Sequence, residues 1–311
     1  MDLSTLDPEL AEALVGVPPY ELTSSTLAAQ RLAFAPLGAP LSDEVTRTDL
    51  RIDPYGPIVR VHRPANTTGP LPCLLWMHGG GLVLGDRFQD DLRFDAWCRR
   101  HQTVAVSIEY RLAPEHPYPA AIDDCVSAFA WLTANSADLG IDPRRIGVGG
   151  ASAGGGLAAA LSQVLRDRDL ALPSFQLLIY PMLDDRRRTA SSQAELPMWP
   201  PAANAFGWRS YLGDLVGTAE VHSHASPARA VDFRSLPRAY VVVGGLDPFL
   251  DEVVDYATRL MHADVPTDLR VHTGLPHGFD ALAPRAGAIR RANADLNEWL
   301  GRALLQRPRS S

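Results

Sequence analysis

Short apolar runs alternate along the chain with longer segments in which apolar residues recur every three or four positions. An apolar run of about four to eight residues is typical of a buried strand, and the longer spacing is typical of a helix with one buried face. Their alternation favours a mostly parallel sheet covered by helices on both faces. The sequence therefore predicts an α/β fold with strands at 58–62, 71–77, 103–108, 146–149, 175–180, 239–244 and 267–271.

Two segments interrupt this alternation. Residues 1–45 carry a mixed pattern before the first predicted strand, and residues 183–220 are rich in Pro, Trp and Arg and contain no strand pattern. In an α/β protein such pieces usually cover the carboxyl ends of the strands, where ligands bind. We therefore expect an N-terminal cap segment at 1–45, a core at 46–182, a cap insertion at 183–220 and the second part of the core at 221–311.

Composition and charge narrow the class of protein. The 311 residues are 46% hydrophobic and 21% charged, which is ordinary for a globular chain and excludes overall disorder. The net charge is −7, and all 29 basic residues are arginine. These arginines are scattered rather than gathered with aromatics on one face, so nucleic acid is not an expected partner.

Cysteine use and the chain's apolar runs bear on compartment and metals. Cys73, Cys98 and Cys125 are widely spaced in apolar segments, which predicts buried free thiols. The sequence contains no CxxC pair, so it gives no signal of a zinc site. The N-terminus lacks a basic region followed by an apolar one, and no run of eighteen apolar residues occurs. We expect a cytoplasmic, reduced protein without stable membrane insertion.

The strongest chemical signal is the GxSxG pentapeptide centred on Ser152. It follows the apolar run 146–148 and opens the alanine-rich segment 155–165. A strand that turns sharply into a helix at a serine exposes the hydroxyl as a nucleophile. Gly150 and Gly154 then leave room for the neighbouring strand and helix. Gly and Ser are also common in ordinary turns, so the pentapeptide indicates a nucleophile only if the chain also supplies a general base and an acid.

A dinucleotide-binding interpretation of the same region fails on position. The only GxGxxG/A spacing is Gly154, Gly156 and Ala159, and it begins beyond the turn instead of at a strand end. We therefore discard it.

A serine nucleophile needs a general base, and in this class of fold the order along the chain is serine, acid, histidine. His277 follows the last predicted strand and precedes the final helix, so it lies where a base is expected. The other downstream histidines fall in a connector, a helix or a strand end: His222, His224, His262 and His272.

The acid is expected just beyond the strand 239–244. Asp247 lies there, and Pro248 keeps it from beginning the helix early. Asp251 is the alternative, although an acidic residue in the first turn of a helix also stabilises the helix dipole. We favour Asp247.

Glycines after another strand supply the third element. His78-Gly79-Gly80-Gly81 follows the strand 71–77, and glycines there present backbone N–H groups that can stabilise an oxyanion. The expected donors are the amides of Gly80, Gly81 and Ala153. His78 precedes the serine and has no second ligand in sequence, so we expect it to hold the glycine loop by hydrogen bonds.

Together these residues resemble the bacterial hormone-sensitive-lipase-like (family IV) carboxylesterases of the α/β-hydrolase fold. The matches run in the family's order from about residue 70 to 280. They are His78-Gly79-Gly80-Gly81 with Gly85, the stretch 110–120, Ser152-Ala153-Gly154-Gly155, Tyr180-Pro181 with Asp184, Asp247-Pro248 with Asp251-Glu252, and His277-Gly278-Phe279.

The resemblance implies hydrolysis of small carboxylic esters, usually of short acids, through an acyl-enzyme. Ser152 is then the nucleophile, His277 the general base and then acid, and Asp247 the residue that orients it. The two cap segments form the acyl and alcohol pockets, and no metal or organic cofactor is needed. Many relatives form homodimers through the last strand and a nearby helix.

Some choices stay open. An amidase, formamidase or lactonase uses the same intermediate, and a non-catalytic small-molecule receptor can share the fold, although receptors typically lose a triad residue. A long-chain lipase is disfavoured by the charged segment 184–188.

Ala151 stands where the family commonly has Asp or Thr, and Arg111 is expected to pair with a buried carboxylate. Expected pocket walls, which also suit a core role, are Leu82, Val83, Trp208 and Tyr211.

Overall fold

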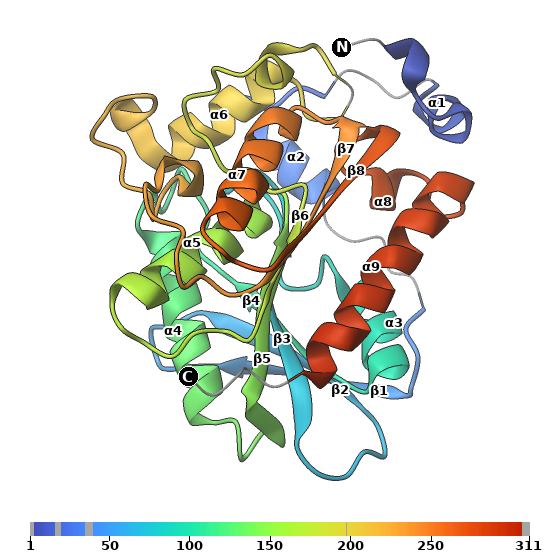
Figure 1. The fold of residues 1–311 in the computed structure, drawn as a ribbon, viewed down its shortest axis with the longest axis vertical. Helices are drawn as coiled ribbons and strands as arrows, with labels where there is room; N and C mark the ends of the chain where they lie inside the picture. The colour runs from blue at the N-terminus through green and yellow to red at the C-terminus, as the bar shows by residue number, and fades with distance from the viewer. Residues whose placement is uncertain (1–2, 16–19, 35–39, 197, 307–311) are drawn as a thin grey trace.

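The computed structural model describes residues 3–15, 20–34, 40–196 and 198–306. In these ranges eight strands form one sheet in the order β1-β2-β4-β3-β5-β6-β7-β8. The predicted α/β fold, with helices on both faces of a mostly parallel sheet, is confirmed (Figure 1). The strands are β1 (Val45–Arg51), β2 (Ile58–Pro64), β3 (Leu71–Met77), β4 (Val104–Glu109), β5 (Ile141–Ala151), β6 (Gln176–Ile179), β7 (Ala239–Leu246) and β8 (Thr267–Pro276).

Of the eight described strands, β2 alone runs in the direction opposite to the others. β1 and β2 are antiparallel, β2 pairs antiparallel with β4, and all pairs from β4 to β8 are parallel. The sequence pattern missed β1, because its residues are mostly polar and only Val45 is buried. A strand at the edge of a sheet can keep polar side chains in water on both faces, so it leaves no apolar run to detect. β8 forms the other edge of the sheet.

Helices cover both faces of the sheet. Figure 1 shows α3 and α9 on one side and α4, α5 and α7 on the other. The parallel strands are therefore buried on both faces, which explains their continuous apolar runs. The helices are α3 (Asp91–His101), α4 (Ala120–Ala134), α5 (Ala153–Asp167), α7 (Leu250–His262), α8 (Phe279–Leu282) and α9 (Gly287–Leu305).

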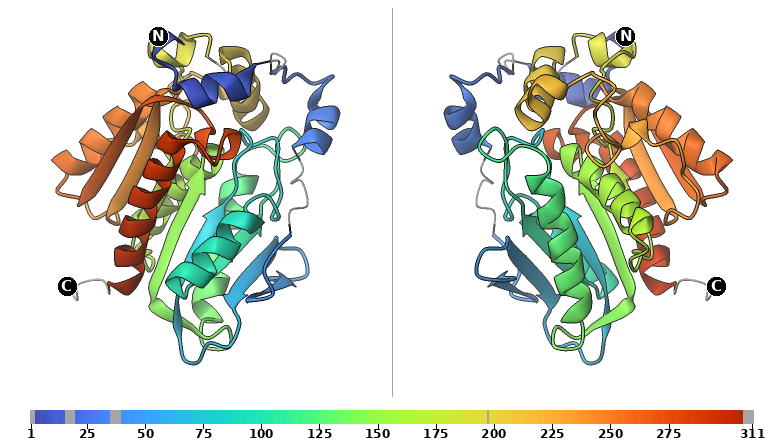
Figure 2. Two further views of the ribbon diagram at one scale, coloured as in Figure 1. Left: turned by 90° about the vertical axis from the view of Figure 1, so that its right-hand side faces the viewer. Right: turned by 90° about the vertical axis from the view of Figure 1, so that its left-hand side faces the viewer.

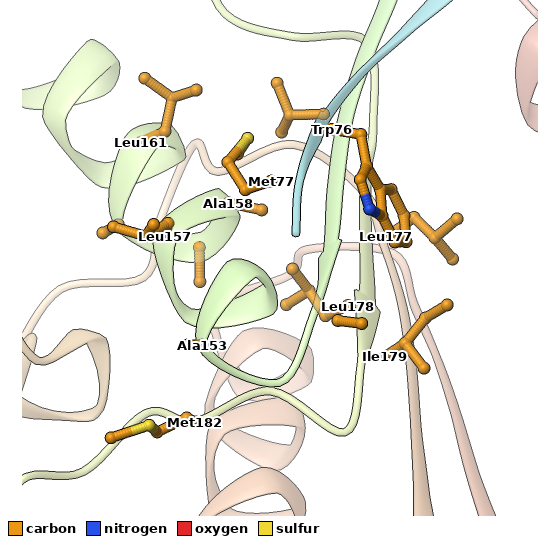
Figure 3. Packing of buried hydrophobic residues seen from close by; sticks show 14 of the residues in the cluster. Trp76, Met77, Ala153, Leu157, Ala158, Leu161, Leu177, Leu178, Ile179 and Met182 are labelled. Atoms are coloured by element: carbon orange, nitrogen blue, oxygen red, sulfur yellow. The ribbon is translucent and has the colours of Figure 1, made fainter. Parts of the chain in front are cut away.

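The core between α5 and the sheet follows the two periodicities of helix and strand. Met77 and Leu178 lie on the side of the sheet that faces α5, where Leu161 also packs (Figure 3). Trp76 and Leu177, one position earlier, lie on the opposite side. This alternation is the two-residue period of a strand. It fixes α5, and therefore the turn that begins it, against strand ends.

The remaining helices lie above the carboxyl ends of the parallel strands. Figure 2 shows α1, α2 and α6 together at this end of the molecule. They come from the two segments expected to form a cap. Their bounds are α1 (Pro8–Leu14), α2 (Leu27–Ala33) and α6 (Pro201–Leu212), and single 3-10 turns lie at Leu3–Thr5, Ser191–Gln193, Gly213–Leu215 and Pro227–Arg229.

Two further expectations concern thiols and membranes. Cys73, Cys98 and Cys125 are buried and free, as predicted. Within the described ranges, no helix combines the length and the apolar character needed to cross a bilayer.

Candidate active site

Ser152 lies at a strained turn between β5 and α5. Its φ of 56° and ψ of −121° are sparsely populated for a residue with a side chain. Three backbone hydrogen bonds hold it there: its N–H donates to Ile179 O at 2.9 Å, and its carbonyl accepts from Gly156 N at 3.1 Å and Met182 N at 3.0 Å. Strain that is fixed by surrounding structure is a common feature of functional sites.

The flanking glycines are required by space. A Cβ on Gly150 would lie 2.2 Å from the carbonyl of Gly154, and a Cβ on Gly154 would lie 2.0 Å from Met77 O. Both contacts are with backbone atoms, which cannot move aside as a flexible side chain does. The structure therefore supports the steric reason inferred from the sequence.

The loops after β7 and β8 bring Asp247 and His277 to this serine. His277 Nε2 lies 2.9 Å from Ser152 Oγ. His277 Nδ1 lies 2.8 Å from Asp247 Oδ2, and the second carboxylate oxygen accepts from Phe249 N at 2.8 Å. The three residues are buried, and Asp247 is fully so.

These contacts define the direction of the hydrogen bonds. An ionised carboxylate only accepts, so the proton of the neutral ring lies on His277 Nδ1. His277 Nε2 is then free to accept from the Ser152 hydroxyl. The arrangement can remove a proton from Oγ while Asp247 holds the ring in the required tautomer.

Asp251, the alternative acid, has a different contact. Its carboxylate accepts from Ser191 N at 2.8 Å, and Ser191 Oγ accepts from Asp251 N at 3.1 Å. This reciprocal pair ties the start of α7 to the insertion. The next residue does the same: Glu252 Oε1 accepts from Leu183 N at 2.7 Å.

None of the other downstream histidines contacts Ser152 in the described residues. His224 bonds to Asp167 at 2.8 Å, and His222 Nδ1 accepts from His224 N at 3.1 Å. His262 ends α7, and His272 lies in β8. His277 is the histidine that the fold brings to the serine.

The glycine loop lies beside Ser152. Gly80 and Gly81 have φ of 116° and 60°, in the region that favours glycine. Among the described residues their amides donate to no acceptor. Ala153 is the first residue of α5, so its N–H has no acceptor within the helix. These are the three expected oxyanion donors.

His78 braces this loop from behind. Its Nδ1 donates to Gly79 O at 2.7 Å, and its ring stacks on Tyr110 with centroids 4.1 Å apart. The Tyr110 hydroxyl donates to His78 O at 2.8 Å. Burial lowers the pKa of His78, which keeps the ring neutral. In the described chain no cluster of three or more metal-ligand side chains occurs.

A cavity of about 1100 Å³ opens in front of Ser152 and His277. Its walls come from both cap segments and from the strand ends. From the N-terminal segment come Tyr20 and Phe34, from the insertion Met198 and Trp199, and from the strand-end loops Gly80, Gln89 and Tyr180.

The four side chains expected to form pocket walls do not line this cavity in the described structure. Leu82, Val83, Trp208 and Tyr211 are all buried. Trp208 and Tyr211 pack against each other at 6.4 Å and belong to the core. The cap residues that line the cavity are Tyr20, Phe34, Met198 and Trp199, and they lie in segments without a strand pattern, so the sequence offered only the aromatic character of three of them as a signal.

One structural expectation outside the cavity is met. Arg111 forms a paired contact with the buried carboxylate of Asp124, donating from Nε at 2.9 Å and from Nη2 at 2.8 Å. This pair anchors the segment after β4 to α4.

A serine at a strained strand-to-helix turn, with an imidazole and a carboxylate from later strand ends, is the arrangement of serine-dependent α/β hydrolases. Residues 74–281 match the family model described as alpha/beta hydrolase fold. The chain belongs to this family, and the predicted hormone-sensitive-lipase-like group is confirmed.

Similar proteins carry esterase names. Esterase LipI of Mycobacterium tuberculosis is 36% identical over 312 residues, which cover 95% of this chain and 93% of LipI. A solved structure described as a bacterial heroin esterase has a TM-score of 0.90 at 35% identity, over 98% of this chain and 99% of that one. Esterase LipW from Mycobacterium marinum has a TM-score of 0.86 at 32% identity, over 98% of both chains.

Proposed function

We propose that this protein hydrolyses small carboxylic esters through an acyl-enzyme formed on Ser152. The observation that carries the proposal is the unbroken hydrogen-bonded line from Ser152 Oγ through His277 to Asp247, with contacts of 2.9 and 2.8 Å. Family membership and the esterase names of similar proteins support the same reaction.

In the first half-reaction Ser152 Oγ attacks the ester carbonyl carbon, and its proton passes to His277 Nε2. The carbonyl π electrons move to oxygen, which becomes the oxyanion. Its collapse breaks the bond to the alcohol oxygen, and His277 returns the proton to that oxygen. In the second half-reaction water attacks the acyl-enzyme with His277 again as base. The second oxyanion then collapses, the bond to Ser152 Oγ breaks, and His277 returns the proton to Oγ, so the acid is released and Ser152 is restored; the alcohol has already left in the first half-reaction.

The amides of Gly80, Gly81 and Ala153 are the proposed oxyanion donors. Free N–H groups in a rigid loop stabilise the developing charge without reorganising during the reaction. The brace formed by His78 and Tyr110 supports this assignment, because it fixes the loop that carries two of the donors. The proposed steps use only groups of this chain.

The position of Trp199 supports a preference for short acids. A Cβ on Gly81 would meet the Trp199 ring at 2.4 Å, so this ring lies directly against the glycine loop. The space beside the oxyanion site is therefore closed on the side of the insertion. We expect acyl groups of a few carbons to fit better than long chains.

The test is a series of p-nitrophenyl esters of increasing acyl length, with the matching p-nitroanilides and a simple lactone as alternatives. The proposal predicts turnover of the short esters, lower turnover of long ones, and slower or no cleavage of the anilides. Anilide or lactone turnover that exceeds ester turnover would assign the amidase or lactonase alternative. Binding of such molecules without any turnover would identify a receptor.

A further inference from the structure

We propose that Tyr180, Asp280 and Arg93 form a positioning group that holds His277 in its reactive orientation. The inference rests on the proposed function and goes beyond it, because none of the three residues belongs to the Ser152–His277–Asp247 line. It assigns a role to a buried polar network directly behind the imidazole.

The network connects three separate parts of the fold. The Tyr180 hydroxyl, just after β6, lies 2.5 Å from Asp280 Oδ1 in α8. The other oxygen of Asp280 accepts from Arg93 in α3 at 2.5 Å. Arg93 Nε also donates to Asp90 at 2.9 Å, and Asp90 accepts from Trp76 Nε1 at 2.7 Å. The line therefore runs from α8 to the centre of the sheet.

The ionisation states give each hydrogen bond a direction. Burial raises the pKa of Tyr180, and the nearby Asp280 carboxylate raises it further. Burial alone would raise the pKa of Asp280, but Arg93 and the Tyr180 hydroxyl lower it below its usual range. Tyr180 is therefore the neutral donor and Asp280 the ionised acceptor, a charge-assisted pair.

The group acts on His277 from two sides. Asp280 lies three positions after His277 in the chain, with Gly278 at a φ of 66° between them, so anchoring Asp280 fixes the loop that carries the imidazole. The Tyr180 ring contacts the imidazole edge-on, with centroids 4.7 Å apart. The same side chain thus holds the loop and packs against the ring.

Other rings and charges around the imidazole do not replace this contact. Phe249 lies 5.0 Å from it and Trp199 lies 6.4 Å from it, but neither bonds to the loop after β8. Asp247 and Ser152 contact the two ring nitrogens, but neither contact fixes the loop after β8 that carries the imidazole. Tyr180 contacts both the ring and, through Asp280, that loop, and its own position is fixed by a hydrogen bond from its N–H to Val242 O at 2.6 Å.

The chain contains a matched control. Tyr240 OH donates to Asp295 at 3.0 Å, and Asp295 accepts from Arg270 at 2.7 Å, which gives a second Tyr–Asp–Arg group. Tyr240 lies near the start of β7, roughly 20 Å along the strand from its carboxyl end. Removing its hydroxyl changes the same chemistry away from the candidate active site.

The experiment compares Tyr180→Phe, Asp280→Asn and the double variant with Tyr240→Phe, using p-nitrophenyl acetate below the thermal midpoint of each protein. We expect each single change at the site to lower kcat by about 10- to 100-fold with KM little changed, because a small misplacement of a reacting group has that cost. The kcat of the double variant should be no lower than that of the poorer single variant, because both substitutions remove the same Tyr180–Asp280 hydrogen bond. Tyr240→Phe should keep the wild-type kcat.

A spectroscopic readout separates this inference from the proposed function. The proton on His277 Nδ1 should give a downfield NMR signal that broadens or moves in Tyr180→Phe and stays in Tyr240→Phe, whether or not an ester is cleaved. If Tyr180→Phe does not fold, Asp280→Asn carries the same comparison. Wild-type kcat and an unchanged signal in both site variants would overturn the positioning role, as would additive effects in the double variant. Absence of ester turnover in the wild type would instead overturn the proposed function.

Discussion

The candidate active site is built from two regions with different kinds of support. The strand-end group (Gly80, Gly81, Ser152, Asp247 and His277) lies on loops that follow buried parallel strands. The cap walls (Tyr20, Phe34, Met198 and Trp199) lie on segments outside the sheet. The first region carries the proposed bond-breaking groups, and the second shapes the space around the substrate. We infer that substitutions in the cap walls can alter substrate preference without altering the catalytic step.

Individual hydrogen bonds and ring contacts tie the cap segments to the core. In the N-terminal segment, Arg31 of α2 donates to Val83 O at 2.9 Å and Ala113 O at 3.1 Å. The insertion is tied to α7 through Asp251 and Glu252. The strand-end group is instead fixed by the sheet itself. Changes in the strand-end group should therefore affect kcat most, and changes in the cap walls should affect substrate preference.

The largest effect is expected for the residues that hold the proton path. His277→Ala and Asp247→Asn should lower kcat by about 10⁴- to 10⁶-fold, because the nucleophile loses its base or the base its tautomer. Thermal unfolding checks that the fold is retained. Asp251→Asn is the control and should keep most turnover. An inactive Asp251→Asn beside an active Asp247→Asn would move the acid role to Asp251.

The second-largest fall in kcat is expected for a change in the glycine loop. A Cβ on Gly80 would lie 2.3 Å from Leu84 O, so Gly80→Ala displaces the loop and its donors. We expect kcat to fall by about 10²- to 10³-fold, the usual cost of losing an oxyanion donor. Gly69→Ala is the matched control, because Gly69 also has a positive φ, of 83°, but has no atom within 4 Å of a Cβ. Equal losses in both variants would contradict the oxyanion assignment.

A cap-wall change should alter preference more than rate. Trp199→Ala opens space against Gly81, so the ratio of kcat/KM for hexanoate to that for acetate should rise by about 10-fold, the scale of discrimination of a hydrophobic pocket. Trp199→Phe retains a ring and should shift the ratio less. Kinetics with both esters measure the effect. An equal fall in kcat/KM for all esters would show that Trp199 supports the reaction itself, as the strand-end group does, and not acyl preference.

The smallest expected effect lies where the two regions join. Burial raises the pKa of Glu252 well above its ordinary value of 4.5. Above that value the unfolded chain releases the proton while the folded protein keeps it, so the free energy of unfolding falls as pH rises toward the folded pKa. Glu252→Gln cannot ionise and should gain thermal midpoint relative to wild type between about pH 5 and 8. If the thermal midpoints of wild type and Glu252→Gln change with pH in the same way, the ionisation of Glu252 does not affect stability.

The strand-end group was predictable because each member follows an apolar run in a fixed order along the chain. Ser152, Asp247 and His277 come together because the carboxyl ends of parallel strands share one edge of the sheet. The cap walls were not predictable in the same way. Trp208 and Tyr211 belong to the regular helix α6 and turn to the core, whereas Trp199 precedes that helix and lines the cavity.

The central claim is that Ser152 is the nucleophile, and labelling with a serine-directed organophosphonate tests it most directly. We predict loss of ester hydrolysis in step with the addition of one phosphonyl group per chain, located on the peptide that contains Ser152. Ser152→Ala should take up no label and hydrolyse no ester. Full labelling of another residue, or continued hydrolysis by Ser152→Ala, would contradict the account.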